Sequence, residues 1–159
     1  MNRLLKSLVL LVSLTLSGVL FAGEVQHQSF HSKTLNRDYV YNIYLPDGYQ
    51  TSGMRYPVFY LLHGNLGTEN SWVSNGNIAE TADALIAAGK IPAQLIVVPA
   101  DPKFWWADGT EEKSLTAFIQ DLVPQVEQQF RTLTQREGRA IGGYSAGGFG
   151  TVNIALQYP

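Results

Sequence analysis

The amino-acid sequence predicts an α/β domain in which a central, mostly parallel sheet is flanked by helices. Segments with strand and helix patterns alternate along the chain, without an internal repeat or an interdomain linker. Continuous apolar runs at 57–62 and 94–98 suit strands that are covered on both faces. A third, shorter run at 140–143 leads into a glycine-rich turn and a further helix pattern. Together these features indicate one layered domain with its sheet in the middle.

The N-terminal segment 1–22 is typical of a secretory signal peptide. Two basic residues precede an apolar stretch at 8–16, and the segment ends in the small residue Ala22. We expect cleavage after Ala22, which leaves a domain at 23–159 and makes the protein secreted or periplasmic, with no stable membrane insertion. An uncleaved membrane anchor is the alternative.

The composition excludes several classes of function. Hydrophobic residues make up 45% and charged residues 15% of the chain, which is typical of a globular protein and not of a disordered one. The formal net charge is -2 at pH 7 and no run of Lys or Arg is present, so nucleic acid is not an expected partner. The absence of Cys excludes disulfides and a thiol nucleophile. Without a His-rich cluster or a phosphate-binding loop, we expect neither a metal nor a cofactor, and the oligomeric state is left open.

The mature chain is expected to begin with strands. A weak strand pattern at 26–30 is followed by a stronger one at 37–45, in which the side chains alternate between two faces. One face of the second strand carries Tyr39, Tyr41, Ile43 and Leu45, and the other carries Val40, Asn42 and Tyr44. Pro46 ends this strand, and the apolar run at 57–62 follows after a polar loop.

The glycine-containing segment 63–67 follows directly on the apolar run at 57–62. In open α/β sheets, ligands bind outside the carboxyl ends of the strands, so this loop is well placed for chemistry. It resembles an oxyanion loop, in which the backbone amide of Asn65, or of Leu66 as the alternative, stabilises negative charge. We expect His63 to order the loop by hydrogen bonding and not to act as the general base.

A helix is expected from Ile78 to about Gly89. Asn77 and Glu80 have the spacing of a capping box at its start, and glycine is a frequent residue just after the end of a helix. The next strand, at 94–98, ends at a proline-containing turn. Its exit is therefore expected to open on the same crevice.

An unusual aromatic loop follows this strand at 103–109. It contains three consecutive aromatic residues, the last two being Trp105 and Trp106, which could form the wall of an acyl or aromatic-substrate pocket or a stacking platform for sugar. Packing in the core is an equal alternative for these side chains, because tryptophan buries a large area. Asp108 or Thr110 could cap the helix that follows.

The helix after the aromatic loop is expected to be interrupted. Apolar residues recur every three or four positions between 115 and 130, which is the spacing of one helix face. Pro124 lies within this pattern, and proline both removes a helical hydrogen bond and crowds the preceding turn. We therefore expect a kink or a break near Gln120.

The segment 140–148 carries the clearest catalytic pattern. Gly143, Ser145 and Gly147 have the G-x-S-x-G spacing of a nucleophile elbow, between a short strand and a helix pattern at 147–158. A tight strand-to-helix turn leaves no space for side chains at the two glycine positions. Ser145 is therefore the candidate nucleophile, and an ordinary glycine-rich turn is the alternative.

The two glycine-containing motifs together predict an acyl-transfer site. The residue after the nucleophile, Ala146, would add a second amide to an oxyanion hole beside the amide of Asn65. Neither role depends on a side chain. We also expect Trp105, Trp106 and Tyr144 to contact the substrate.

With these motifs placed, the chain resembles the esterase family of α/β hydrolases, which includes esterase D-type S-formylglutathione hydrolases, feruloyl esterases, enterochelin esterases and mycolyltransferases. The resemblance extends from about Asn36 to the last residue. It rests on Tyr44-Leu45-Pro46, Tyr60-Leu61-Leu62-His63-Gly64, Glu69-Asn70-Ser71-Trp72, Leu122-Val123-Pro124, Val126-Glu127, Phe130-Arg131-Thr132 and Gly143-Tyr144-Ser145-Ala146-Gly147-Gly148.

This resemblance implies an α/β-hydrolase fold and the hydrolysis of carboxylic esters or thioesters through an acyl-enzyme on Ser145. Asn65 and Ala146 would supply the oxyanion amides, and the substrate would be a small-molecule or carbohydrate-linked ester of a small or aromatic acyl group. Because a signal peptide is expected, the chain resembles the exported feruloyl or acetyl-xylan type more than the cytosolic S-formylglutathione type.

The sequence departs from the family pattern after the elbow. In this family the triad acid and histidine follow the serine, whereas residues 146–159 contain no Asp, Glu or His. We therefore expect the chain to be the N-terminal part of a longer hydrolase, truncated after the elbow helix and inactive alone. Two further functions stay open, namely acyl transfer by the same fold and a non-catalytic module that binds carbohydrate or esters.

Overall fold

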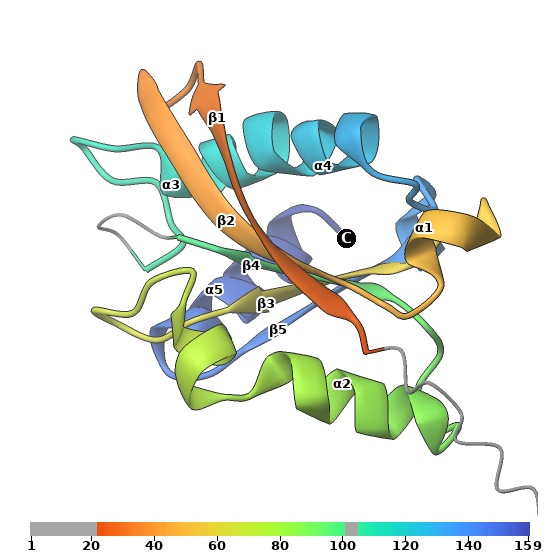
Figure 1. Ribbon diagram of the computed structural model, residues 1–159. Coiled ribbons are helices and arrows are strands. Elements are labelled where there is room, and N and C mark those ends of the chain that lie inside the picture. Colours follow the sequence, from red (N-terminus) through yellow and green to blue (C-terminus); the bar gives the residue numbers. More distant parts are fainter. Residues whose placement is uncertain (1–21, 101–104) are drawn as a thin grey trace, which may run out of the picture.

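A five-stranded mixed sheet forms the centre of the molecule in the computed structural model, which describes residues 22–100 and 105–159 (Figure 1). The strands are β1 (Glu24–Ser32), β2 (Arg37–Leu45), β3 (Val58–Leu62), β4 (Leu95–Pro99) and β5 (Arg139–Gly143), in the order β1-β2-β4-β3-β5. Strands β4, β3 and β5 are parallel, whereas β1 and β2 join the sheet antiparallel. The expected α/β fold class is confirmed, with the parallel pairing confined to the strands whose exits carry the motifs. Residues 1–21 of the signal peptide expected at 1–22, and residues 101–104, lie outside the described residues.

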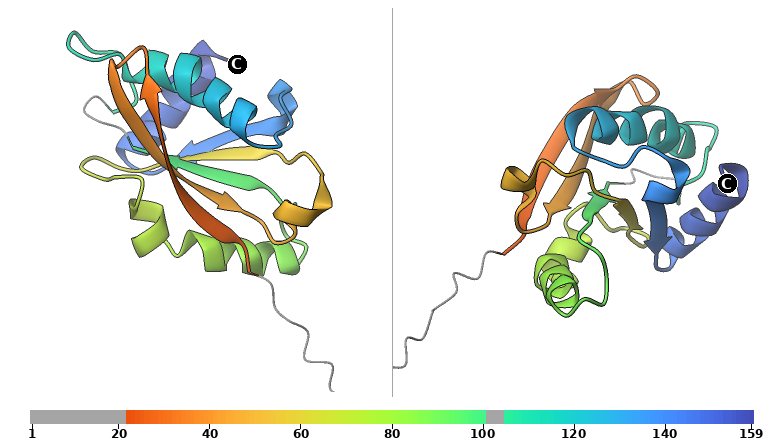
Figure 2. Two further views of the ribbon diagram at one scale, coloured as in Figure 1. Left: turned by 45° about the horizontal axis from the view of Figure 1, so that its top comes forward. Right: turned by 90° about the vertical axis from the view of Figure 1, so that its right-hand side faces the viewer.

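Helices cover both faces of the sheet, as the two views of Figure 2 show. One face is covered by α2 (Ile78–Ala87), and the other by α3 (Ser114–Ala117), α4 (Val123–Gln129) and α5 (Ala146–Gln157). The shorter elements are α1 (Tyr49–Ser52), two π-helical segments, η1 (Ser71–Asn75) and η2 (Phe118–Leu122), and the 3-10 turn η3 (Arg136–Gly138). Within the described part of the chain, no helix has the length and apolar character that crossing a membrane requires.

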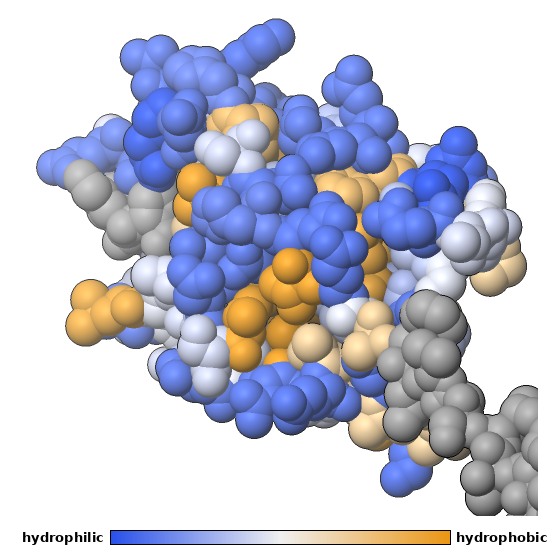
Figure 3. Space-filling view, viewed as in Figure 1, coloured by the Kyte–Doolittle hydropathy of each residue, from blue (hydrophilic) through white to orange (hydrophobic). Residues whose placement is uncertain are grey.

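Strict alternation along the strands divides the core into two hydrophobic clusters. In β3, Tyr60 and Leu62 face the cluster under α3, α4 and α5, whereas Leu61 faces α2. The same alternation in β2 buries Tyr39, Tyr41, Ile43 and Leu45 together, as the sequence predicts. In Figure 3, hydrophobic residues gather between helix α2 and the strand pair formed by β1 and β2. Hydrophilic residues cover most of the rest of this face. Each large side chain buried in this way stabilises the fold by roughly 1.5–3 kcal/mol.

The expected break near Gln120 is confirmed. Pro124 lies in the first turn of α4. The five residues directly before α4 form the π-helical segment η2, which contains Gln120. Proline has no amide hydrogen to donate to the carbonyl group four residues earlier, which is that of Gln120. The helix therefore widens into a π-turn instead of ending, and its apolar face stays continuous.

The two expected helix caps differ in outcome. Asp108 accepts hydrogen bonds from the backbone amide and the hydroxyl of Thr116, at 3.0 and 2.6 Å, and so supports the first turn of α3, although Lys113 occupies the N-cap position. The prediction of a capping box at Asn77 is wrong, because Asn77 has a left-handed backbone (φ 45°) and makes no side-chain cap hydrogen bond. A capping side chain reaches the helix amides from an extended backbone.

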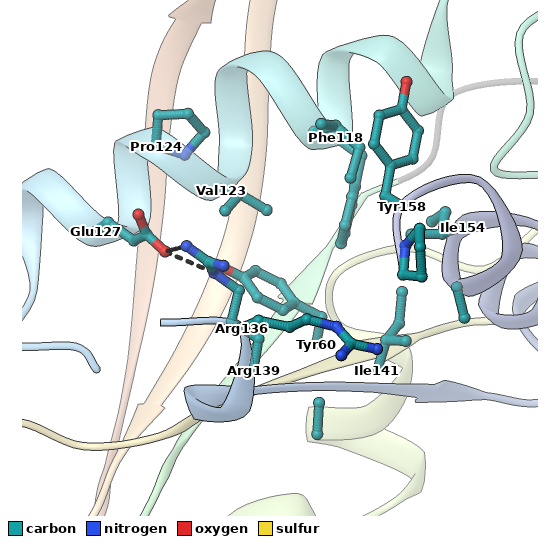
Figure 4. Close-up of a pocket in the computed structure, with 14 residues that line it drawn as sticks. Tyr60, Phe118, Val123, Pro124, Glu127, Arg136, Arg139, Ile141, Ile154 and Tyr158 are labelled. Carbon is teal, nitrogen blue, oxygen red and sulfur yellow. Dashed lines mark hydrogen bonds and ion pairs between the residues drawn. The ribbon is translucent and has the colours of Figure 1, made fainter. Parts of the chain in front are cut away.

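The edge strand β5 borders a cleft of about 610 Å³. Within the described residues, β3 is the only strand that pairs with β5, and Ala140, the second residue of β5, is exposed. The cleft lies over the first part of β5, between η2, α4 and the end of α5, as Figure 4 shows. Its walls include Tyr60, Phe118, Ile141, Ile154 and Tyr158, none of which is an expected site residue. The apolar surface beside β5 is therefore separate from the elbow.

We expect the segment 23–159, purified without further sequence, to bind a hydrophobic dye and to associate, because an unpaired apolar edge offers backbone groups to another chain. Dye fluorescence and light scattering measure the two effects. The variant Ala140→Lys places a charge on the exposed edge and should reduce association while leaving the melting temperature nearly unchanged. A monodisperse segment without dye binding would contradict this expectation.

Candidate active site

The elbow at Ser145 joins β5 to α5 through a strained backbone. Ser145 has φ 54° and ψ -122°, a conformation that is almost confined to glycine and costs a side-chain-bearing residue about 1–3 kcal/mol. The turn is held by hydrogen bonds from the Gly147 amide to the Tyr144 carbonyl, at 2.8 Å, and from the Phe149 amide to the Ser145 carbonyl, at 3.0 Å. Strain of this kind persists where the surrounding structure enforces it and is a common feature of functional sites.

The two glycines of the motif are required by close backbone contacts. A Cβ atom added at Gly143 would lie 2.7 Å from the Leu62 carbonyl oxygen, and one at Gly147 would lie 2.5 Å from the same atom. At Gly147 it would also meet the carbonyl oxygen of His63 at 2.6 Å. The steric reason expected for these glycines is confirmed.

The hydroxyl of Ser145 is available for chemistry. The residue is exposed and occupies the N-cap position of α5, where a serine hydroxyl usually binds a helix amide, yet Ser145 makes no such cap hydrogen bond. In the described residues its Oγ atom has no hydrogen-bond partner at all. Its position at the positive end of a twelve-residue helix favours negative charge nearby. An ordinary capping role therefore does not account for this serine.

The sheet brings the expected oxyanion loop next to the elbow. Strands β3 and β5 are parallel neighbours, and their register pairs Leu62 with Gly143, so residues 63–67 and the elbow leave the same edge side by side. The Gly67 amide closes the loop onto the Gly64 carbonyl at 3.1 Å. Among the described residues, the amides of Asn65, Leu66 and Ala146 donate to no protein acceptor. Amides without an internal acceptor are one requirement for oxyanion donors, and the assignment of Asn65 and Ala146 stays a prediction.

The three histidines lie away from Ser145 or beneath the loop. His63 is 2% exposed, its Nδ1 atom donates to the Gly64 carbonyl at 2.8 Å, and its ring meets that of Trp106 at a centroid distance of 5.1 Å. His27 and His31 are on β1, at the opposite edge of the sheet from β5. These positions support the loop-ordering role expected for His63. In the described part of the chain no histidine is hydrogen-bonded to the candidate nucleophile.

Trp106 is a core residue. It is 1% exposed, its indole nitrogen donates to the His63 carbonyl at 3.2 Å, and its ring contacts Phe118. Gly150 of α5 packs so closely on it that a Cβ atom there would be 2.4 Å from the Trp106 Cβ. This burial favours the packing alternative for Trp106 over contact with substrate. Packing between β3 and α5 is the role that the structure assigns to it.

Trp105 and Tyr144 are exposed at the mouth of the site, each with 51% of its surface accessible. The Trp105 indole nitrogen donates to the side-chain oxygen of Asn65 at 3.1 Å, which ties the aromatic loop to the oxyanion loop. Tyr144 meets the Trp72 ring edge-on, with centroids 5.4 Å apart. Substrate contact stays a prediction for both residues.

Sequence reasoning missed one residue of this aromatic group. Phe149 is 51% exposed and lies edge-on to Trp105, with ring centroids 6.4 Å apart. Its signal in the sequence is its position four residues after Ser145, because residues at that spacing share one face of a helix. Among the described residues, no group of three or more acidic or histidine side chains could hold a metal ion.

Residues 32–159 match the sequence model of a family described as "Putative esterase". The chain belongs to this esterase family. It is 34% identical over 146 residues to an endo-1,4-β-xylanase/feruloyl esterase of Xylanibacter ruminicola, an alignment that covers 86% of this chain and 20% of the relative. It is also 36% identical over 127 residues to an esterase of Mycobacterium tuberculosis, which covers 74% of this chain and 26% of that esterase.

Solved structures of esterases share the fold of this chain. A ferulic acid esterase superposes with a TM-score of 0.82 at 30% identity, over 87% of this chain and 54% of that enzyme. An S-formylglutathione hydrolase from Agrobacterium tumefaciens gives a TM-score of 0.73 at 23% identity, over 87% of this chain and 55% of its own. The expected α/β-hydrolase fold is thus confirmed for its N-terminal portion. The chain spans about half the length of these structures.

The substitution Gly147→Ala should disrupt the elbow, because its new methyl group would collide with two carbonyl oxygens of the backbone. We expect the free energy of unfolding of the full-length protein to fall by about 2–4 kcal/mol, together with the loss of covalent labelling at Ser145. The matched control is Gly148→Ala, where the nearest atom to a new Cβ is 3.5 Å away. Denaturant unfolding should show a change within about 1 kcal/mol for this control, and equal effects of the two substitutions would contradict the packing argument.

Proposed function

We propose that this protein is an exported serine esterase that hydrolyses carboxylic esters through an acyl-enzyme on Ser145. The observation that carries the proposal is the conformation of Ser145, whose strained backbone holds an exposed hydroxyl at the carboxyl end of a parallel strand. Membership of the esterase family supports ester hydrolysis. The signal-peptide pattern of residues 1–22 supports export.

In the proposed reaction, Ser145 Oγ attacks the ester carbonyl and loses its proton to a general base. The oxygen of the tetrahedral intermediate becomes negatively charged and accepts hydrogen bonds from the amides of Asn65 and Ala146. Collapse of the intermediate breaks the ester bond, and the alcohol leaves with the proton that the base returns. Water then attacks the acyl-enzyme by the same steps, which releases the acid and restores the hydroxyl.

The general base and its acid partner come from sequence that follows residue 159 in the full-length protein. Two observations support this part of the proposal. His63 is buried against Trp106 beneath the oxyanion loop, and the other histidines are on the far edge strand. The described fold also corresponds to only 54% of the similar ferulic acid esterase.

An aromatic acyl group is the substrate class that the mouth of the site fits best. Trp105, Tyr144 and Phe149 present accessible aromatic rings around Ser145, and such rings stack on a flat acyl group. Relatives named as feruloyl or ferulic acid esterases support the same class. The alcohol part is proposed to be carbohydrate, and transfer of the acyl group to a sugar in place of water is the competing reaction.

The first test compares the full-length protein, its Ser145→Ala variant and the 159-residue chain. A fluorophosphonate probe should label only the full-length protein with serine in place, and hydrolysis of p-nitrophenyl acetate should fall by about a thousandfold to a millionfold in the other two. Absence of labelling together with retained ester binding would support a non-catalytic module. Strong Ser145-dependent turnover by the short chain would place the base on His27, His31 or His63.

A second test separates the two tryptophans of the aromatic loop. Trp105→Ala should change the ratio of kcat/KM for aromatic over acetyl esters by about tenfold, with little change in melting temperature, because its ring is exposed. Trp106→Ala should instead destabilise the fold by about 3–5 kcal/mol and lower activity equally on both esters, because it leaves a cavity in the core. A shifted ratio for Trp106→Ala alone would reverse the two roles.

A further inference from the structure

The start of the mature domain is held by a carboxylate of α2. The backbone nitrogen of Gly23 lies 3.0 and 3.1 Å from the two carboxylate oxygens of Asp83, and the Tyr44 hydroxyl donates to the first of these oxygens at 2.6 Å. Figures 1 and 2 show the beginning of β1 against α2, where these groups meet. Three elements, the entry to β1, strand β2 and helix α2, therefore converge on one acidic side chain.

The donor set around Asp83 lacks a positive charge. A peptide amide has a single hydrogen, which both carboxylate oxygens share here, and the tyrosine hydroxyl is neutral. The ion pairs formed by the described residues involve other carboxylates, and none includes Asp83, although its side chain is half-buried. An ammonium group at the position of the Gly23 nitrogen would supply both a charge and a separate hydrogen for each oxygen, which makes a stronger, charge-assisted contact.

Residue 23 must also be glycine. A Cβ atom at this position would lie 2.3 Å from the Cε2 atom of the Tyr44 ring, and Tyr44 is itself 1% exposed and unable to move aside. Ala22, by contrast, is exposed. The last residue of the signal-peptide pattern is thus accessible to a protease, whereas the next residue fits only without a side chain.

We propose that cleavage between Ala22 and Gly23 creates an α-ammonium group that binds Asp83, so that the mature N-terminus locks β1 to α2. A signal peptidase breaks the peptide C–N bond with water, whose hydroxyl passes to the Ala22 carbonyl and whose hydrogen passes to the Gly23 nitrogen. The new amine takes up a proton from solvent and keeps the position that the amide holds. This inference concerns maturation and does not depend on the proposed esterase activity.

Acidic groups lie around the Gly23 nitrogen. They are Asp83 on α2, Tyr44 on β2, Asp47 in the turn after β2, which acts on Tyr44, and the neighbouring Glu24. Burial, followed by the hydrogen bond and the charge of Asp83, raises the pKa of Tyr44, which stays a neutral donor. A free α-amino group has a pKa of about 8, and acidic neighbours raise it in the folded state. The stabilisation is then complete below about pH 8 and is lost as the pH rises through the folded-state pKa.

The first experiment identifies the mature N-terminus. The full-length protein is expressed with its own leader in a bacterial host, and the exported product is analysed by intact mass and by N-terminal sequencing. We expect the product to begin at Gly23. A product that begins at another residue, or that keeps the leader, would overturn the proposal.

The second experiment measures the effect of the charge. The full-length protein is prepared with Gly23 as its first residue and, separately, with Ser-Ala added before Gly23. At pH 6.5 the Gly23 form should melt about 4 °C higher. This difference should vanish above pH 10, because the amine paired with Asp83 then loses its charge, whereas the Gly23 amide of the extended form has no charge to lose. A difference of the same size at both pH values, or no difference, would refute the ion pair.

Variants of the carboxylates complete the test. Asp83→Asn should remove the advantage of the Gly23 form at pH 6.5, whereas Asp47→Asn, a neighbouring exposed carboxylate, should leave it in place. Equal losses for the two variants would assign the effect to overall charge and contradict the specific pair. If Asp83→Asn fails to fold, the comparison of the two wild-type forms still decides the question.

Discussion

The close approach of the elbow to the end of β3 is the constraint on which the rest of the site depends. Gly143 and Gly147 sit so near the Leu62 carbonyl that neither position has space for a Cβ atom. This contact fixes the angle between β5 and α5 and forces Ser145 into a backbone conformation that serine rarely adopts. The same contact sets residues 63–67, the expected oxyanion loop, beside the start of α5.

Two tryptophans, one in η1 and one in the aromatic loop, hold the end of β3 in place. The indole nitrogen of Trp72 donates to the Leu62 carbonyl at 3.1 Å, and that of Trp106 donates to the His63 carbonyl at 3.2 Å. The two rings belong to the hydrophobic clusters on opposite faces of the sheet. Successive carbonyl groups of one strand end are thus bound from both sides, which makes the backbone under the elbow rigid. Rigid support of this kind is what precise positioning of a nucleophile requires.

The two edges of the sheet differ in how they are closed. At β1, Asp83 accepts hydrogen bonds from the amide of Gly23, which directly precedes the strand, and from the hydroxyl of Tyr44, and hydrophobic side chains fill the space above α2. At β5, a cleft of about 610 Å³ leaves Tyr60 and Ile141 beside open space. Strand β5 also leads to Ser145, the candidate nucleophile. The open cleft therefore lies along the strand that leads to the candidate nucleophile.

The sequence by itself determined the main elements and the steric requirement of the elbow turn. The alternation in residues 37–45 predicts the two faces of β2, and Pro124 predicts the π-helical break at Gln120. The glycines around Ser145 predict a turn without space for side chains. These features depend on neighbours within a few residues, so a local pattern reveals them. The resemblance to esterases was also readable, because its motifs are short and contiguous.

The tertiary structure alone decided the order of the strands, the burial of Trp106 but not Trp105, the place of Phe149 and the contact between Gly23 and Asp83. Trp105 and Trp106 are adjacent in the sequence and have the same local pattern, yet Trp105 is 51% exposed and Trp106 is 1% exposed. Gly150 of α5 leaves the space that Trp106 occupies in the core, and this contact is formed only in the folded chain. Likewise, the pairing of Gly23 with Asp83 joins residues 60 positions apart. Contacts between segments distant in the chain leave no periodic signal in either segment, so only the folded chain displays them.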